Sequence, residues 1–290
     1  MRDSSGQDGR GGKTLQVARY VPSKSVTLAR VMKGTTFFVI RLSMKRLFTP
    51  IPYAVALLLY SCLISFADKA PQNSMGPSSS SNGPPERPYY LTGDEDVWKG
   101  FPAKPALGSA IDQADLLITL SVQASRNDDQ KNEALRDQKY SIKLVTDVID
   151  PDFEAKYPDV FHVLANADID SYFINTMVKK ANARLRPFVQ HPTLVIALFD
   201  VADFSYPSGH ASGTELQARI LARLFPKQEE ALLKRVRQIA DSRVVGGVHY
   251  ASDTEAGLAL GDLLFIEIEA QPRFQQDMTA AVTKDQLPVK

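Results

Sequence analysis

The sequence predicts an all-α fold, and three observations lead to that prediction. Apolar residues recur at spacings of three and four along several segments, which is typical of amphipathic helices. Proline or glycine stands where some of these segments begin or end. Strand-like alternation is scarce, and the β-branched runs 193–196 and 244–248 are short and ambiguous. We therefore expect one helical domain of roughly 200 residues, long enough to bury a sizeable core.

The expected helices follow one another from residue 111 to residue 270. The first has the helical spacing of apolar residues, and the second reads as an amphipathic helix that Pro187 ends. A turn at Pro207-Ser208-Gly209 precedes the third helix. The expected ranges are 111–125, 168–185, 211–224, 228–245 and 253–270.

The region before this domain reads as an export signal. Residues 47–67 carry no charge, and Lys45 and Arg46 stand directly before them. Ser65 and Ala67 put small residues at the −3 and −1 positions of a cleavage after Ala67. Basic residues, an apolar run and a small-residue exit make up a secretory signal peptide. The alternative is a membrane anchor, since 21 uncharged residues could span a bilayer.

These features divide the chain into four expected parts. Met44 is a natural start for a signal peptide of residues 44–67, so residues 1–43 are either a mis-called upstream start or a disordered N-terminal extension. Residues 68–88, rich in Pro, Ser, Asn and Gly, form a disordered linker. Residues 89–290 form the folded domain. After cleavage this domain would be periplasmic or secreted, and only an uncleaved segment would attach it to a membrane.

The charge balance and the cysteine count exclude several kinds of protein. Residues 1–67 hold 10 Lys or Arg against 2 Asp or Glu, whereas the rest of the chain holds 24 against 31. The folded part is therefore acidic, which argues against a nucleic-acid binder. The single cysteine, Cys62, excludes an intrachain disulfide framework and a zinc site built on several cysteines. Any anion must be bound by a local cluster of cations.

The first of three motifs is Lys179-Lys-Ala-Asn-Ala-Arg-Leu-Arg186-Pro187. Lys179 and Arg186 are seven residues apart, which would place them on one helix face, two turns apart. A lysine point charge and a bidentate arginine fork suit a phosphate clamp. The plainer alternative is a solvated basic face, and we expect Lys180 and Arg184 to belong to one.

The second motif is Tyr206-Pro207-Ser208-Gly209-His210, a tight turn that runs into a helix. The free N–H groups and the positive dipole end of a helix form an anion site. Ser208 can cap this helix or donate its hydroxyl, and His210 can point at the same anion as a proton donor. An ordinary serine-capped helix with an exposed histidine is the alternative.

The third motif is Ser242-Arg243-x5-His249-x3-Asp253. If the chain is helical from His249, then His249 and Asp253 lie one turn apart and can touch. An aspartate bonded to one imidazole nitrogen leaves the other nitrogen free as a nucleophile. Arg243 could supply a second guanidinium, and the glycines at 246 and 247 allow a close backbone approach. A helical pair that only adds stability, or two metal ligands, are the alternatives, but no third ligand is evident.

In this order, the three motifs resemble the signature of the type 2 phosphatidic acid phosphatase superfamily. Within it, the chain is most similar to the secreted bacterial class A non-specific acid phosphatases. The shared features are the signal peptide, the mature size, the stretch Ser205-Tyr-Pro-Ser-Gly-His210 and the acidic helical region 108–141. Ala211 stands where Thr is common and Phe204 where Gly is common, which leaves substrate preference and pocket shape open.

The resemblance implies a compact single-domain bundle of the kind found in these phosphatases and in the vanadium haloperoxidases. It implies an acid phosphatase that hydrolyses small phosphate monoesters without a metal ion or another cofactor. His249 would be the nucleophile that forms a phosphohistidine, Asp253 would orient it, and His210 would be the general acid and base. A homo-oligomer is compatible with this fold. The phosphate would be held by Lys179, Arg186, Ser208, Gly209 and Arg243.

Three other functions fit parts of the sequence. A lipid phosphatase of the same superfamily would usually span the membrane several times, and this chain has one run of that length. A vanadate-dependent haloperoxidase would use the same cage for vanadate. A catalytically silent anion-binding protein would not need the set of His210, His249 and Asp253.

Overall fold

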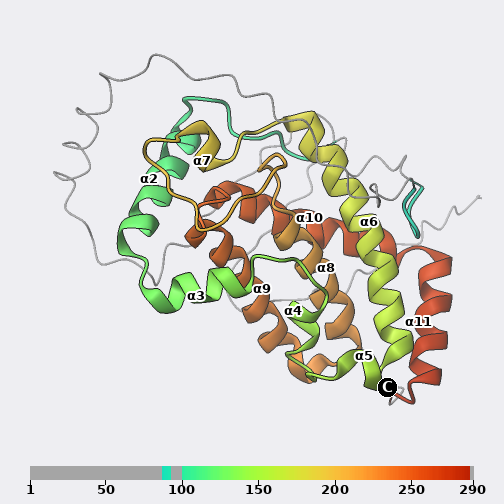
Figure 1. Ribbon diagram of the computed structural model, residues 1–290. Helices are drawn as coiled ribbons and strands as arrows, with labels where there is room; N and C mark the ends of the chain where they lie inside the picture. The colour runs from blue at the N-terminus through green and yellow to red at the C-terminus, as the bar shows by residue number, and fades with distance from the viewer. Residues whose placement is uncertain (1–86, 93–99, 288–290) are drawn as a thin grey trace, which may run out of the picture. The chain divides into compact units, whose positions relative to one another are not determined.

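The computed structural model describes residues 87–92 and 100–287 of the chain (Figure 1). The chain divides into two units, Met1–Gly76 and Pro77–Lys290, and all the described residues lie in the second. The expected extension (1–43), the signal peptide (44–67) and all but the last two residues of the linker (68–88) lie outside the described residues. These parts stay predictions.

The regular secondary structure of the described residues is entirely helical, which confirms the predicted all-α fold. The ambiguous run 193–196 forms a turn and coil, and the run 244–248 spans a helix end and a turn. The helices are α2 (Ala110–Ser125), α3 (Asp128–Arg136), α4 (Lys143–Thr146), α5 (Phe153–Lys156), α6 (Pro158–Asn182), α7 (Pro187–Gln190), α8 (Gly209–Leu224), the 3-10 turn η2 (Pro226–Gln228), α9 (Glu229–Val245), α10 (Ala251–Glu269) and α11 (Pro272–Lys284).

Four expected helices agree with α2, α8, α9 and α10 to within two residues at each end. The helix expected over 168–185 was wrong at both ends, since α6 begins at Pro158 and ends at Asn182. Proline suits the first turn of a helix. Helix α3 lies in the acidic helical region 108–141 but was given no bounds of its own, and α11 and the short helices α4, α5 and α7 were not expected. The start of α3 has a readable signal, since Asn127 and Gln130 form a reciprocal capping box. Among the described residues, no helix combines the length and the apolar character that crossing a membrane requires.

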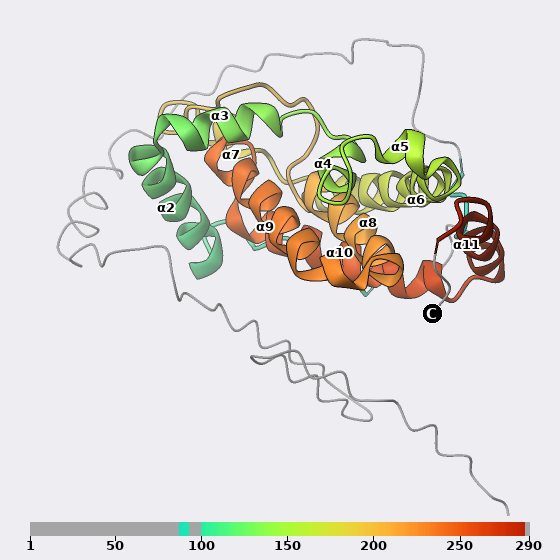
Figure 2. The ribbon, with the colours of Figure 1, turned by 90° about the horizontal axis from the view of Figure 1, so that it is seen from below.

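Helix α8 packs against α6, α9 and α10, and Figure 2 shows α8, α9 and α10 side by side. Two glycines on one face of α10 allow the closest of these approaches. A Cβ atom at Gly257 would lie 2.5 Å from the Ser208 carbonyl oxygen, and one at Gly261 would lie 2.5 Å from the Glu215 Cβ. A larger residue at either position would push α10 away from the start of α8.

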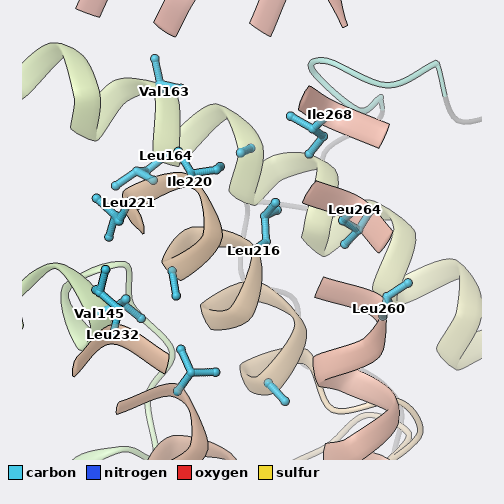
Figure 3. Packing of buried hydrophobic residues seen from close by; sticks show 14 of the residues in the cluster. Val145, Val163, Leu164, Leu216, Ile220, Leu221, Leu232, Leu260, Leu264 and Ile268 are labelled. Atoms are coloured by element: carbon cyan, nitrogen blue, oxygen red, sulfur yellow. The ribbon is translucent and has the colours of Figure 1, made fainter. Parts of the chain in front are cut away.

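The apolar core lies where these helices meet. Full burial of one such side chain stabilises the fold by about 1.5–3 kcal/mol. Because the same helices end near the second and third motifs, the core also fixes their relative position. Figure 3 labels its members Val145, Val163, Leu164, Leu216, Ile220, Leu221, Leu232, Leu260, Leu264 and Ile268.

Candidate active site

Six of the eight predicted site residues line one cavity of about 880 Å³, which we name the cationic cavity. Its walls come from the segment before α4, from α6 and from the connection between α6 and α8. The first turn of α8, the last turn of α9 and the segment before α10 complete them. This volume falls in the range of about 300–1,000 Å³ of small-molecule sites. The six residues are Lys179, Arg186, Gly209, His210, Arg243 and His249. Ser208 and Asp253 are fully buried and do not line the cavity.

Lys179 and Arg186 do not share a helix, so the predicted geometry of the first motif was wrong. Helix α6 ends at Asn182 because Ala183 adopts a left-handed conformation with φ of 45°, and Arg186 lies beyond it as the N-cap of α7. The two cations nevertheless meet at one carboxylate. Lys179 Nζ lies 3.1 Å from Asp203 Oδ2, and the Arg186 guanidinium contacts Asp203 Oδ1.

The second motif starts α8 as the sequence predicts. Ser208 is the N-cap, and its hydroxyl oxygen accepts from the Ala211 N–H at 3.4 Å. Its own N–H donates to the Asp253 carbonyl at 2.9 Å, which ties the start of α8 to that of α10. His210, in the first turn, has a buried Nε2 with no hydrogen-bond partner among the described residues. Burial, with Arg243 and then Arg186 nearby, lowers the pKa of His210 to about 3.

His249 and Asp253 come together, although α10 begins only at Ala251. His249 Nδ1 lies 3.5 Å from Asp253 Oδ2 but has no hydrogen-bond partner among the described residues, and that oxygen accepts from the Tyr250 N–H at 2.9 Å. On the other side of the ring, Arg186 Nη1 lies 3.0 Å from His249 Nε2. A guanidinium can only donate, so Nε2 must offer its lone pair and the ring proton of a neutral imidazole sits on Nδ1.

The surroundings of His249 keep it neutral. Burial lowers its pKa well below the ordinary value, and the charges of Arg186, Lys179 and Arg243 lower it further. A neutral ring whose Nε2 lone pair faces a cationic cavity has the form that a nitrogen nucleophile requires.

Arg243 is 1% exposed and has few partners. Its Nη1 donates to the Asp137 carbonyl at 3.2 Å and more weakly to that of Gln138, and its guanidinium lies over the Phe199 ring at 5.0 Å. Its Nε has no partner among the described residues. Burial lowers its pKa to about 9. The guanidinium is therefore held in place but only partly satisfied.

The third motif's glycines make room for the loop that carries Phe199. Gly247 has φ of 71°, a conformation that other residues rarely adopt, and a Cβ there would lie 3.2 Å from the Ile196 carbonyl oxygen. A Cβ at Gly246 would lie 2.9 Å from the Phe199 ring. The expected close backbone approach is thus to this loop, which packs on Arg243.

Arg184 was expected on a solvated face, and this expectation was wrong. It is 3% exposed, whereas Lys180 is exposed as expected. Its guanidinium stacks over the Tyr250 ring at 4.0 Å. The sequence carries a weak signal for this role, because two acidic residues stand three apart in the first expected helix. The hydrogen-bond acceptors of Arg184 are Asp253 Oδ1 at 2.7 Å, Ser252 Oγ at 2.8 Å, Asp115 Oδ2 at 2.9 Å and Asp112 Oδ1 at 3.2 Å.

The sequence analysis also missed a polar group beside His210. The Tyr140 ring meets the His210 ring edge-on, with centroids 5.4 Å apart, and its hydroxyl donates to Asp168. Gln217 Nε2 donates to the Tyr140 hydroxyl at 2.8 Å. Burial raises the pKa of Asp168 to about 6. No spacing in the sequence connects these residues. In the ranges 87–92 and 100–287, no three His, Cys, Asp or Glu side chains gather in a way that could hold a metal ion.

Known proteins resemble the chain over this region. Residues 162–275 match the family model described as the PAP2 superfamily. A non-specific acid phosphatase from Salmonella typhi is 30% identical over 156 residues, which cover 50% of this chain and 62% of that protein. One from Providencia stuartii is 24% identical over 237 residues, 78% of this chain and 95% of that protein. The resemblance inferred from the three motifs is thereby confirmed.

The overlap with the first of these relatives is partial, since the chain spans 62% of its length. Among solved structures, a bacterial vanadium-dependent iodoperoxidase is 16% identical with a TM-score of 0.49, over 61% of this chain and 53% of that one.

Proposed function

Because residues 162–275 match the PAP2 superfamily, we propose that the protein is an acid phosphatase that hydrolyses phosphate monoesters. One observation carries the proposal. A neutral His249 with an accepting Nε2, a second histidine and three cations all line the same cavity. Phosphoryl transfer is mostly positioning and charge stabilisation, which this set can supply.

In the first proposed step, the His249 Nε2 lone pair attacks phosphorus in line with the leaving group. The N–P bond forms while the P–O bond to the alcohol breaks, and the leaving oxygen takes a proton from His210. Asp253 orients His249 through Nδ1 and stabilises the positive charge that develops on the ring. The product of this step is a phosphohistidine.

In the second step, water attacks the phosphohistidine. His210, now neutral, takes a proton from the attacking water, the N–P bond breaks, and phosphate leaves. His249 returns to its neutral form and His210 to its protonated form, so the cycle closes without a further reactant.

The phosphoryl oxygens would be held by Lys179, Arg186 and Arg243, with the Gly209 N–H at the start of α8. Ser208 does not line the cavity and caps α8 through its hydroxyl oxygen, so it would reach the phosphoryl group only through its hydroxyl proton. Each lost donor of this kind typically raises the barrier by about 2.7–4 kcal/mol. We propose that these side chains stabilise the charge without a metal ion.

We propose that the active form is the domain 89–290, periplasmic after removal of residues 44–67. The support is the charge and hydropathy pattern of the N-terminal sequence. Sequencing the N-terminus of protein recovered from the periplasmic fraction tests this part. A mature chain that begins at Asp68 supports it, and a retained apolar segment contradicts it.

The activity is tested by hydrolysis of p-nitrophenyl phosphate from pH 4 to 8 with EDTA present. Turnover should peak in acid, survive EDTA and vanish in His249→Ala. His162→Ala, which changes an exposed histidine outside the cavity, is the matched control and should keep its activity. A folded protein with no turnover, or a His249→Ala variant that keeps it, contradicts the proposal. Lipid phosphates and vanadate-dependent halide oxidation would then be assayed.

A further inference from the structure

The cavity already contains an anion that belongs to the chain. Asp203 lies on the connection between α7 and α8, and its carboxylate joins Lys179 to Arg186. These two cations are 8% and 3% exposed, whereas the Asp203 side chain is 56% exposed. The carboxylate is therefore the member of the group that can turn into solvent.

The donors of Arg186 are all engaged in this arrangement. Nε donates to the Asp203 carbonyl at 2.7 Å, and Nη2 donates to the Asp203 carboxylate. Nη1 donates to the Val248 carbonyl at 2.7 Å and faces His249. A phosphate that binds Arg186 through two parallel hydrogen bonds must therefore take the place of an existing partner. Apart from the His249 ring, the carboxylate is the partner that does not belong to the backbone.

The backbone beside Asp203 holds the two cations by itself. The Phe204 carbonyl accepts from Lys179 Nζ, and it lies 3.4 Å from Arg186 Nη2. Together with the Asp203 carbonyl, these contacts stay in place when the charge of the side chain is removed. Asparagine at position 203 would thus keep the shape of the site and remove its internal anion.

We propose that Asp203 is an internal counter-ion that the phosphate group of a substrate displaces, and that its charge sets the affinity of the cavity for phosphate. The proposal rests on the proposed function. The carboxylate and a phosphate group compete for the same charge-assisted donors. In the empty cavity Asp203 pairs with Lys179 and Arg186, and when phosphate is bound the Asp203 side chain turns outward. Asp203 touches no reacting atom and acts only on binding.

The test is isothermal titration of the full-length protein with inorganic phosphate at pH 7. Asp203→Asn should bind phosphate about tenfold more tightly than the wild type, a factor that corresponds to about 1.4 kcal/mol. The KM for p-nitrophenyl phosphate should fall by a similar factor while kcat changes little. Asp200→Asn is the matched control, because Asp200 is another acidic residue that lines the same cavity.

Each outcome separates the two proposals. If Asp203→Asn binds phosphate as the wild type does or more weakly, Asp203 positions the cations and the displacement proposal is wrong. An equal gain in Asp200→Asn would also overturn it, since general charge would then explain the effect. If the wild type binds phosphate without hydrolysing p-nitrophenyl phosphate, the proposed function fails while the displacement result still stands. If neither protein binds phosphate, both proposals fail.

Discussion

Arg184 and Arg243 are both buried arginines near His249, but their partners differ completely. Arg184 is surrounded by the carboxylates of Asp112, Asp115 and Asp253. Arg243 has backbone carbonyls and an aromatic ring, and its Nε has no partner among the described residues. A buried charge is costly unless it is paired. A buried guanidinium without a carboxylate partner, such as that of Arg243, therefore points to an anionic ligand.

Lys179 and Arg186 lie between these extremes, because they share one carboxylate that is itself half exposed. The number of buried carboxylates around a cation thus separates a structural arginine from cations that can bind phosphate. Variants that change one cation at a time test this difference.

The largest effect is expected for Arg184→Met. The substitution leaves three carboxylates without their shared cation, and breaking a buried pair in this way costs about 3–5 kcal/mol. The free energy of unfolding, measured by urea denaturation, should fall by that amount. Activity should fall too, because Asp253 loses the partner of its Oδ1. An unchanged unfolding midpoint would show that Arg184 is not the structural member of the comparison.

Arg243→Met is expected to separate activity from stability. The rate kcat for p-nitrophenyl phosphate should fall about 10²–10³-fold, as when one charge-stabilising donor is lost. The free energy of unfolding should not fall, because the substitution removes a buried cation that has no carboxylate partner. Equal losses of stability in Arg243→Met and Arg184→Met would erase the distinction between the two arginines.

A pH profile tests the influence of Arg243 on His210. His210, the proposed general acid, must be protonated, so the rate is expected to fall as pH rises through its pKa. Burial and the nearby arginines lower that pKa to about 3 in the free site, and a bound phosphate opposes those cations. The alkaline limb of kcat should therefore lie at higher pH than that of kcat/KM.

Arg243→Met provides the control for this profile, because the substrate titrates identically in both proteins. Without the Arg243 charge, the pKa of His210 rises and the limb of kcat/KM should move to higher pH. A limb that stays in place would show that another group controls the acid step.

The smallest effect concerns Lys179. Burial lowers its pKa to about 8, although Asp203 opposes that shift. The ammonium charge is present below this pKa and is lost above it, so phosphate affinity should decrease as pH rises beyond about 8. In Asp203→Asn the decrease should begin at lower pH, because the opposing charge is gone. Titrations with inorganic phosphate above pH 7 measure both curves, and coincident curves would contradict the coupling.

The sequence was enough to predict the fold class and to select three motifs, six of whose predicted site residues line one cavity, because helical periodicity and motif spacing are local properties. It failed where contacts are distant along the chain. Arg184 was assigned to a solvated face because its carboxylate partners lie about 70 positions away in either direction.

The placement of Lys179 and Arg186 shows a second limit. A spacing of seven residues suggested one helix face, but the left-handed Ala183 ends α6 before Arg186. The two cations come together where both contact the Asp203 carboxylate. The partners Asp203, Tyr140 and Asp168 belong to no motif, and tertiary packing alone brings them to the cavity.

In the proposed mechanism His249 carries the phosphoryl group between the two steps, and trapping this phosphohistidine tests the mechanism. The full-length protein would be mixed with substrate, quenched in alkali, where phosphohistidine survives, and digested for mass spectrometry. We expect a phosphoryl group on the peptide that contains His249, and none in His249→Ala. A phosphoryl group on another residue, or turnover with no phosphorylated peptide, would contradict it.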